Sequence, residues 1–356
     1  MMKTEQHEFQ PDWISVPGDT ISDILEDRHI SPPEFAARIG CTVEQTKDLL
    51  LGRQPVTNVI AQKLEQEFGT SAAFWMSRES QYRGDLLRVG HKWLDELPLN
   101  DMIKFGWIKA SHSFGDRIAA CFNFFDVPDV TAWRERYYAL TEKTAFRTSP
   151  SFESDLGAVA TWLRQGEIES ASINCKSWDA EMFKKALIGI RTLTRERDPN
   201  IFIPELKKRC ADCGIAVVVL RTPSRCRASG ATHFLLQDKA LLMLSFRFLS
   251  DDHFWFTFFH EAGHLLLHNK KAIFLEGAET RAEEEAEANN FATHTLVPDE
   301  FRAAMLNLPL NGREVIRFAK TVGISPGILV GQLQHYGRFT RRQLNNLKTR
   351  FAWTNA

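Results

Sequence analysis

The chain has 356 residues, of which 44% are hydrophobic and 25% are charged, and its formal net charge is −1. These proportions are those of globular proteins and exclude the collagen-like and intrinsically disordered classes. The near-zero charge gives no overall basic field for nucleic acid, and no apolar run reaches the ~20 residues that span a membrane. A chain of this length is expected to form two or three domains.

The first residues, MMKTEQHEFQPDW, lack the basic and apolar regions of a secretory signal, so we expect a cytoplasmic protein with no membrane partner. The six cysteines are scattered and do not form the framework of a small disulfide-bonded protein. Cys210 and Cys213 have the spacing of a metal or redox pair, with Cys226 nearby, but no second pair completes a structural zinc site. We therefore expect reduced, partly buried thiols.

Residues 1–15 are polar and predict a flexible arm. Helix-start signals punctuate residues 16–85: Ser31 precedes two prolines and a glutamate, and Thr42 forms a capping box with Gln45. These signals predict short helices over 21–28 (capped by Thr20), 34–39, 43–51, 58–68 and from 72 onward.

Residues 86–200 have the apolar spacing of amphipathic helices, and no chemistry can be assigned to them. From residue 201 the sequence pattern changes from amphipathic helices to short apolar runs. These runs predict buried strands over 214–220, 231–236 and 240–246. Two further helices are predicted over 254–268 and 279–295. The segment 311–356 is predicted to be helical, and its net charge is +7 because eight basic residues stand against one acidic residue.

The most informative motif is His260-Glu261-Ala262-Gly263-His264, within the apolar helix predicted over 254–268. Residues four apart share one face of a helix, so both imidazoles can reach a single cation. Glu261 lies about 100° further round the helix, close enough to reach a water bound to that cation. A buried helix has little reason to carry two histidines and a glutamate unless something pairs them. The motif predicts a metal site.

A catalytic zinc site needs a third protein ligand and an open position. His268 continues the four-residue spacing, but three ligands along one straight helix do not converge tetrahedrally, so we interpret it as a supporting or exposed residue. The helix over 279–295 offers better donors, its glutamates Glu283, Glu284, Glu285 and Glu287. Glu285 is the predicted ligand, because Asn289 follows one turn later and can hold a histidine N–H. Glu287 is the alternative.

The segments WFTFFHEAGHLLLH (255–268) and EAEANNFATHTLVP (285–298) resemble the ImmA/IrrE family of zinc metallopeptidases, whose ligand pattern is gluzincin-like. The resemblance extends over about 200–356, including GISPGILVGQLQ (323–334). It implies a zincin-like α+β metallopeptidase domain with a small sheet over 201–310, closed by the basic helical segment 311–356. It also implies one zinc ion per chain, with His260, His264 and Glu285 as ligands, Glu261 as general base and Asn289 in support.

The chemistry of such a site is peptide-bond hydrolysis, in which zinc activates a water and Glu261 takes its proton. The oxyanion that forms needs another donor, and His233 and His294 are the titratable candidates. If the strand over 240–246 lies at the edge of the sheet, we expect it to pair with an extended peptide substrate.

Residues 16–85 resemble the XRE-type helix-turn-helix, in particular the HigA-like antitoxins. The resemblance rests on PGDTISDILEDRHISPPEFAARIGC (17–41) and LLLGRQPVTNVIAQKLEQEFGTSAAFW (49–75). In such modules the second helix of the motif, here 43–51, enters the major groove of DNA. The resemblance implies operator binding as a homodimer, with base contacts from Glu44, Gln45 and Lys47 and backbone contacts from Arg53 and Gln54.

The charge of this region departs from the pattern. Residues 16–85 carry seven basic and eleven acidic side chains, and Asp48 stands where the family usually has a basic residue. Because phosphate attraction supplies most DNA affinity, a degenerate protein-interaction module is the alternative interpretation. Residues 318–325 echo residues 35–42 within the basic C-terminal segment, so that segment is a second candidate for DNA contact.

Taken together, these patterns predict a multidomain, mainly α protein: an all-α helix-turn-helix domain, a helical middle region and a zinc metallopeptidase domain. The resemblances imply a cytoplasmic zinc endopeptidase coupled to a transcription regulator. Its expected partners are operator DNA, a cleaved repressor or antitoxin, and a cognate toxin. The rival hypothesis is a regulator or antitoxin whose peptidase fold binds or senses without cutting.

Overall fold

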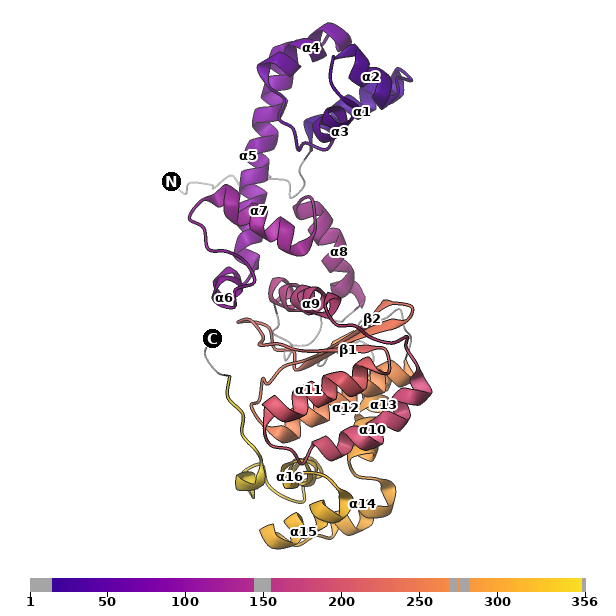
Figure 1. The fold of residues 1–356 in the computed structure, drawn as a ribbon. Coiled ribbons are helices and arrows are strands. Elements are labelled where there is room, and N and C mark those ends of the chain that lie inside the picture. Colours follow the sequence, from indigo (N-terminus) through magenta and orange to yellow (C-terminus); the bar gives the residue numbers. More distant parts are fainter. Residues whose placement is uncertain (1–14, 144–154, 269–273, 276–281, 354–356) are drawn as a thin grey trace, which may run out of the picture. The chain divides into compact units, whose positions relative to one another are not determined.

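The computed structural model describes residues 15–143, 155–268, 274–275 and 282–353. The chain divides into two compact units, Met1–Asp95 with Val127–Arg134, and Glu96–Asp126 with Glu135–Ala356. Its described residues are mainly helical and include one small sheet, which confirms the predicted multidomain, mainly α fold (Figure 1). None of their helices is long and apolar enough to cross a membrane.

The first unit is built from short helices around an apolar core of Phe35, Leu64 and Trp75. Ser31 Oγ accepts the N–H of Glu34, and Thr42 Oγ1 accepts the N–H of Gln45, so both predicted start signals are formed. The elements are α1 (Pro17–Asp27), α2 (Pro32–Arg38), α3 (Val43–Leu50), α4 (Asn58–Phe68) and α5 (Ala72–Glu96).

Two predictions for this region need correction. The first helix begins at Pro17 rather than after Thr20, because proline suits the first turn and the Asp19 carboxylate accepts the N–H of Val16 at 3.0 Å. The predicted domain boundary after residue 85 falls inside the continuous helix α5. The predicted arm over 1–15 lies outside the described residues, apart from Ser15.

The second unit contains the sheet and the helices that cover it, and α8 (Val130–Lys143) spans the division between the units. Before the sheet come α6 (Leu99–Lys104), α7 (Phe114–Phe125), α9 (Leu156–Ala171), α10 (Ala180–Leu193) and α11 (Pro199–Ala211). The remaining elements are β1 (Ile215–Val219), β2 (Gly230–Leu236), β3 (Lys239–Leu244), α12 (Asp251–Leu267), β4 (Phe274–Leu275), α13 (Ala282–Leu296), α14 (Asp299–Leu306), α15 (Gly312–Val322) and α16 (Pro326–His335).

The strand order of the sheet is β1-β3-β2-β4. β3 is parallel to β1 and antiparallel to β2, and β4 is antiparallel to β2. β3 is therefore an interior strand with both backbone edges paired, so the predicted substrate pairing along 240–246 is wrong.

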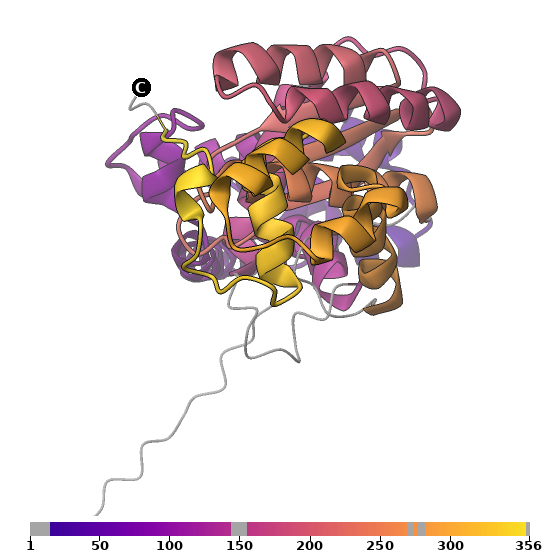
Figure 2. The ribbon, with the colours of Figure 1, turned by 90° about the horizontal axis from the view of Figure 1, so that it is seen from below.

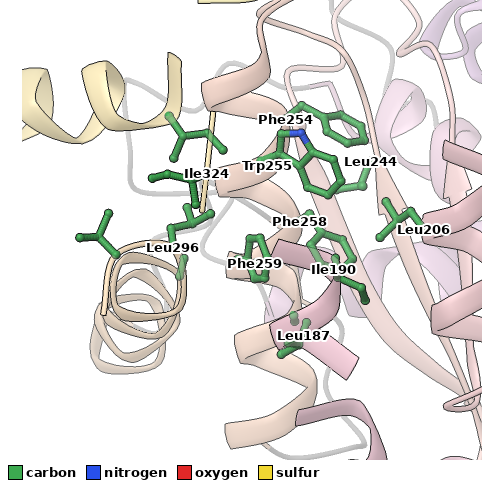
Figure 3. Close-up of a cluster of buried hydrophobic side chains, with 14 of the residues drawn as sticks. Leu187, Ile190, Leu206, Leu244, Phe254, Trp255, Phe258, Phe259, Leu296 and Ile324 are labelled. Atoms are coloured by element: carbon green, nitrogen blue, oxygen red, sulfur yellow. The ribbon is translucent and has the colours of Figure 1, made fainter. Parts of the chain in front are cut away.

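Helices cover both faces of the sheet in this unit. α9 packs on β1 and β3 from one side, while α11 contacts β1 and α12 contacts β2 and β3 (Figure 1). This double cover explains why β1 is apolar at every position, Ile-Ala-Val-Val-Val, instead of alternating. On the α12 side, aromatic residues of α12 meet leucines and isoleucines from several elements, among them Leu206 of α11 and Leu244 of β3 (Figure 3).

The helix that carries the His-Glu-x-x-His motif begins at Asp251, three residues before the predicted start. Asp251 and Asp252 form its first turn, where carboxylates favour the positive end of the helix dipole. Asp251 also accepts the N–H of Thr349, at 3.0 Å, and the hydroxyl of Ser325, at 2.7 Å. The start of α12 is therefore fixed by contacts from the C-terminal segment.

Within the C-terminal segment, α16 is the helix that packs against α12 (Figure 2). Residues 312–322 and 326–335 are helical as predicted. Residues 336–353 contain turns and one 3₁₀ turn, Asn345–Leu347, so the helical prediction fails there. In α16 the apolar side chains of Ile328, Leu329 and Val330 are at most 1% exposed. A helix buried in this way cannot enter a DNA groove, which argues against the second candidate for DNA contact.

A candidate metal centre between α12 and α13

The motif histidines and glutamate lie in the interior of the second unit. His260, Glu261 and His264 are 2%, 0% and 1% exposed. Gly263 stands between them on the side of α13, where an added Cβ would lie 3.2 Å from the Cα of Ala288. The missing side chain allows α12 and α13 to approach closely, and this brings the acidic residues of α13 to the histidines.

Glu285 is the glutamate that reaches the two histidines. Its carboxylate oxygens lie 3.3 Å from His260 Nε2 and 3.3 Å from His264 Nε2. The two Nε2 atoms are 3.0 Å apart. Donor atoms of these three residues lie within 4.8 Å of one another and form the one such cluster of three or more metal-binding side chains among the described residues.

The Nδ1 atoms of the two histidines, on the side away from Glu285, form hydrogen bonds with other side chains. His260 Nδ1 lies 3.1 Å from Asn289 Oδ1, which accepts its N–H. His264 Nδ1 lies 2.9 Å from His268 Nδ1, and His268 Nε2 lies 3.0 Å from Glu287 Oε2. With protons on these outer contacts, the Nε2 lone pairs of His260 and His264 both face Glu285.

The series of contacts from His264 to His268 and on to Glu287 shows what His268 and Glu287 do, which the sequence did not decide. Glu287, the alternative third ligand, contacts His268 instead of the histidine pair, and its side chain is 63% exposed. The His268 side chain is 4% exposed and stands behind His264. A histidine four residues after the motif, one turn further along the same face, is the sequence signal for this support.

The ionisation states suit metal binding. Burial lowers the pKa of His264, which outweighs the opposing effect of Glu285 and favours the neutral ring. Burial raises the pKa of Glu285, but its contacts with His260 and His264 outweigh this effect and lower the pKa to about 2. Neutral imidazoles and an ionised carboxylate are the forms that bind divalent metal ions.

Gly230, which sequence reasoning missed, touches the motif glutamate. It begins β2, and a Cβ added there would lie 2.6 Å from both Glu261 Oε1 and Thr257 Cγ2. The backbone of β2 therefore forms one wall of the space around the Glu261 carboxylate. A lone glycine at the start of a predicted strand was the available signal, because it marks a close approach.

The two histidines proposed as oxyanion donors lie elsewhere. In β2, Ala231 pairs with Met243, whose side chain packs on Gly166 of α9, so this face of the sheet points toward α9. His233 follows two residues after Ala231 and shares that face, opposite Gly230. Burial lowers its pKa and keeps it neutral.

His294 is nine residues from Glu285, which places it on the opposite side of α13. It is half-exposed and lies 3.3 Å from Asp299. Neither candidate oxyanion donor therefore faces the cluster of His260, His264 and Glu285.

The predicted DNA-contacting residues lie on and after α3. Glu44 and Lys47 are exposed. Gln45, however, uses its side chain to accept the N–H of Thr42, and Arg53 lies 3.8 Å from Asp48. The capping box in the sequence already indicated that Gln45 has a local role.

The cysteines are all free thiols. Burial raises the pKa of Cys210 and of Cys226, so both stay protonated.

Comparison with known proteins covers part of the chain. No curated protein matches it. Residues 214–333, which begin just before β1 and end within α16, match the family model Peptidase_M78, described as the IrrE N-terminal-like domain. The segment that carries the sheet, the His-Glu-x-x-His helix and Glu285 is thus similar to the peptidase domain of the ImmA/IrrE family.

Proposed function

We propose that this protein is a zinc-dependent endopeptidase whose metal is held by His260, His264 and Glu285. The observation that carries the proposal is the convergence of two buried imidazoles and the partly buried Glu285 carboxylate beside Glu261. The similarity of residues 214–333 to M78 peptidases supports the same reaction class.

The donor set fits zinc. Ligand atoms ~2.0–2.1 Å from a tetrahedral zinc ion are ~3.3 Å from one another. Here the two Nε2 atoms are 3.0 Å apart, and each lies 3.3 Å from a different oxygen of the Glu285 carboxylate, so one donor atom from each residue lies within 4.8 Å of the other two. Two imidazoles and one carboxylate leave a fourth position for water, as in thermolysin-like sites. Zinc bound here would supply Lewis acidity that activates water and polarises the peptide carbonyl.

Glu261 is the general base in this proposal. Its side chain lies on α12 next to His260, is fully buried and borders Gly230, so bulk water does not compete for it. It accepts a proton from the attacking water and passes that proton to the nitrogen of the departing amine. His260 and His264 keep their protons on Nδ1, directed to Asn289 and His268, and leave the peptide bond to Glu261.

The test separates metal binding from proton transfer. Glu261→Gln should keep about one zinc per chain and lose cleavage of a proteome-derived peptide pool by at least ~10²-fold, because an amide accepts no proton. His260→Ala/His264→Ala should lose both zinc and cleavage. Metal analysis and mass spectrometry of the peptides give the two readouts. A wild-type protein that holds zinc and cleaves nothing would refute the endopeptidase.

We further propose that the first unit binds operator DNA as a homodimer and that the substrate is a repressor or antitoxin. Exposed Lys47 on α3 supports this proposal. Selection from a random DNA pool should recover one sequence with the full chain and none with Lys47→Glu. The same sequence from both proteins would remove α3 from recognition.

The second candidate is a regulator or antitoxin that binds without cutting. It is favoured by the local contacts of two predicted DNA-contacting residues, because the Gln45 carboxamide oxygen accepts the N–H of Thr42 and Asp48 offsets the charge of Arg53. Co-purification of a small toxin with Glu261→Gln and wild type alike, without cleavage by either, would support it.

A further inference from the structure

A cavity of about 600 Å³ lies at the N-terminal end of α12. Its walls come from α12, α13, α16 and the C-terminal segment, and include His253, Phe256, Thr293 and Gln332. The proposed hydrolysis does not use these residues.

The cavity continues the face of α12 that carries the metal-binding histidines. The ring of Phe256, in its wall, stacks on His260 with centroids 6.3 Å apart. His253 precedes His260 by seven residues, which is nearly two helical turns, so both point the same way. Along the helix axis they are ~10 Å apart.

The cavity carries excess positive charge. Lys348 and Asp252 form a buried pair at 2.6 Å and cancel each other. Arg341 and Arg350 also line the cavity, and neither has an ion-pair partner within the described parts of the chain. Burial lowers the pKa of His253, Asp252 opposes this effect, and the charges of Lys348, Arg350 and Arg341 lower the pKa further, so Arg341 and Arg350 lie close enough to this wall residue to act on it.

The cavity also offers a buried acceptor. Gln332 is 6% exposed, and its Oε1 has no hydrogen-bond partner among the described residues. Its Nε2 is directed to the carbonyl of Thr293 at 3.5 Å, which leaves the oxygen for another donor. A simple anion has no N–H to give, whereas a peptide carries N–H groups together with acidic side chains.

We propose that this cavity is a specificity subsite that takes an aspartate or glutamate side chain of the protein substrate. Arg341 and Arg350 would bind the carboxylate, and Gln332 would accept an N–H of the peptide. Extended peptides rise ~3.3 Å per residue, so the acidic side chain would lie about three residues from the cleaved bond. This inference rests on the proposed endopeptidase activity.

Cleavage of a proteome-derived peptide pool tests the subsite. Wild-type protein loaded with zinc should enrich Asp and Glu at one fixed position, two to four residues from the cut. Arg341→Ser/Arg350→Ser should reduce that enrichment about 10-fold. All four arginines are exposed, but Arg338 and Arg342 do not line the cavity, so Arg338→Ser/Arg342→Ser removes the same charge and should preserve the enrichment. Cleavage without an acidic preference would overturn the subsite and leave the endopeptidase standing.

A binding measurement decides the case where nothing is cleaved. Fluorescent peptides with one glutamate, and matched peptides with glutamine, are titrated into the Glu261→Gln protein. The acidic peptide should bind at least 10-fold more tightly, and the Arg341→Ser/Arg350→Ser change should remove the difference. Equal affinities, or binding of inorganic phosphate in place of the peptide, would overturn the proposal whatever the fate of the endopeptidase.

Discussion

At the residue scale, the two histidine ligands of the proposed metal centre depend on the side chains that contact their Nδ1 atoms. Asn289 accepts the Nδ1 proton of His260, and His268 stands behind His264. Such partners fix the tautomer and the ring orientation, so that the Nε2 lone pair is aimed at the cation before it binds.

Replacement of Asn289 measures this support. Asn289→Ala should weaken zinc affinity ~10–100-fold, whereas Asn289→Asp retains an acceptor and should stay close to wild type. Competition with a chelator of known affinity provides the measurement. Asn290→Ala, one position along the same helix, is the matched control. If Asn289→Ala and Asn290→Ala have equal affinities, the contact to His260 contributes nothing to binding.

At the scale of elements, the start of α12 carries an unfavourable buried charge. Burial raises the pKa of Asp251 to about 6, although hydrogen bonds from Ser325 and from the backbone N–H of Thr349 partly oppose it. The folded state therefore prefers the neutral acid. Its contribution to stability is complete below the unfolded pKa, near 4, and is lost as the pH rises through 6.

Asp251→Asn removes this titration. Between pH 4 and pH 7 the free energy of unfolding of the variant should rise relative to wild type by up to about 3 kcal/mol, the value of a shift of about two pKa units. Chemical denaturation at several pH values measures it, and the shared metal ligands titrate alike in both proteins. Parallel profiles would mean that Asp251 titrates in the folded protein as it does in the unfolded chain.

The loop-to-helix signals predicted most of the first unit because they act locally. Ser31 and Thr42 cap helices through contacts three residues away, which a sequence displays directly. The faces of longer helices and of strands are set by distant partners. The start of α12 depends on Ser325 and Thr349, which lie 74 and 98 residues away from Asp251, and the predicted start was three residues too late.

At the scale of the whole molecule, the proposed ligands could be predicted but their surroundings could not. His260, His264 and Glu285 follow from spacing on two helices and from a family resemblance. The order of the strands in the sheet does not follow from the sequence in this way, because it depends on which strand edges pair. This is why the sequence left open whether β3 lies at an edge, and why His233 stayed a candidate oxyanion donor although its face of the sheet points toward α9.

The family match covers less than the structural unit, and this has a testable effect on folding. Residues 214–333 lack α9, α10 and α11, which contribute fully buried side chains such as Trp162, Phe183 and Phe202. A fragment of 214–333 should aggregate on expression, while 155–353 should remain in solution and unfold cooperatively. Sedimentation and thermal unfolding distinguish them. Cooperative unfolding of 214–333 within a few degrees of 155–353 would contradict this expectation.

The cover that α9 gives to the sheet also bears on how such a domain can be inherited. The stretch that holds the chemistry leaves one face of its sheet to be closed by a helix that lies more than 40 residues earlier in the chain. A gene rearrangement that moved only the segment 214–333 would leave the apolar face of its sheet exposed to water. For that segment to fold in another protein, α9 has to be moved with it, or an element of the new protein has to cover the same face.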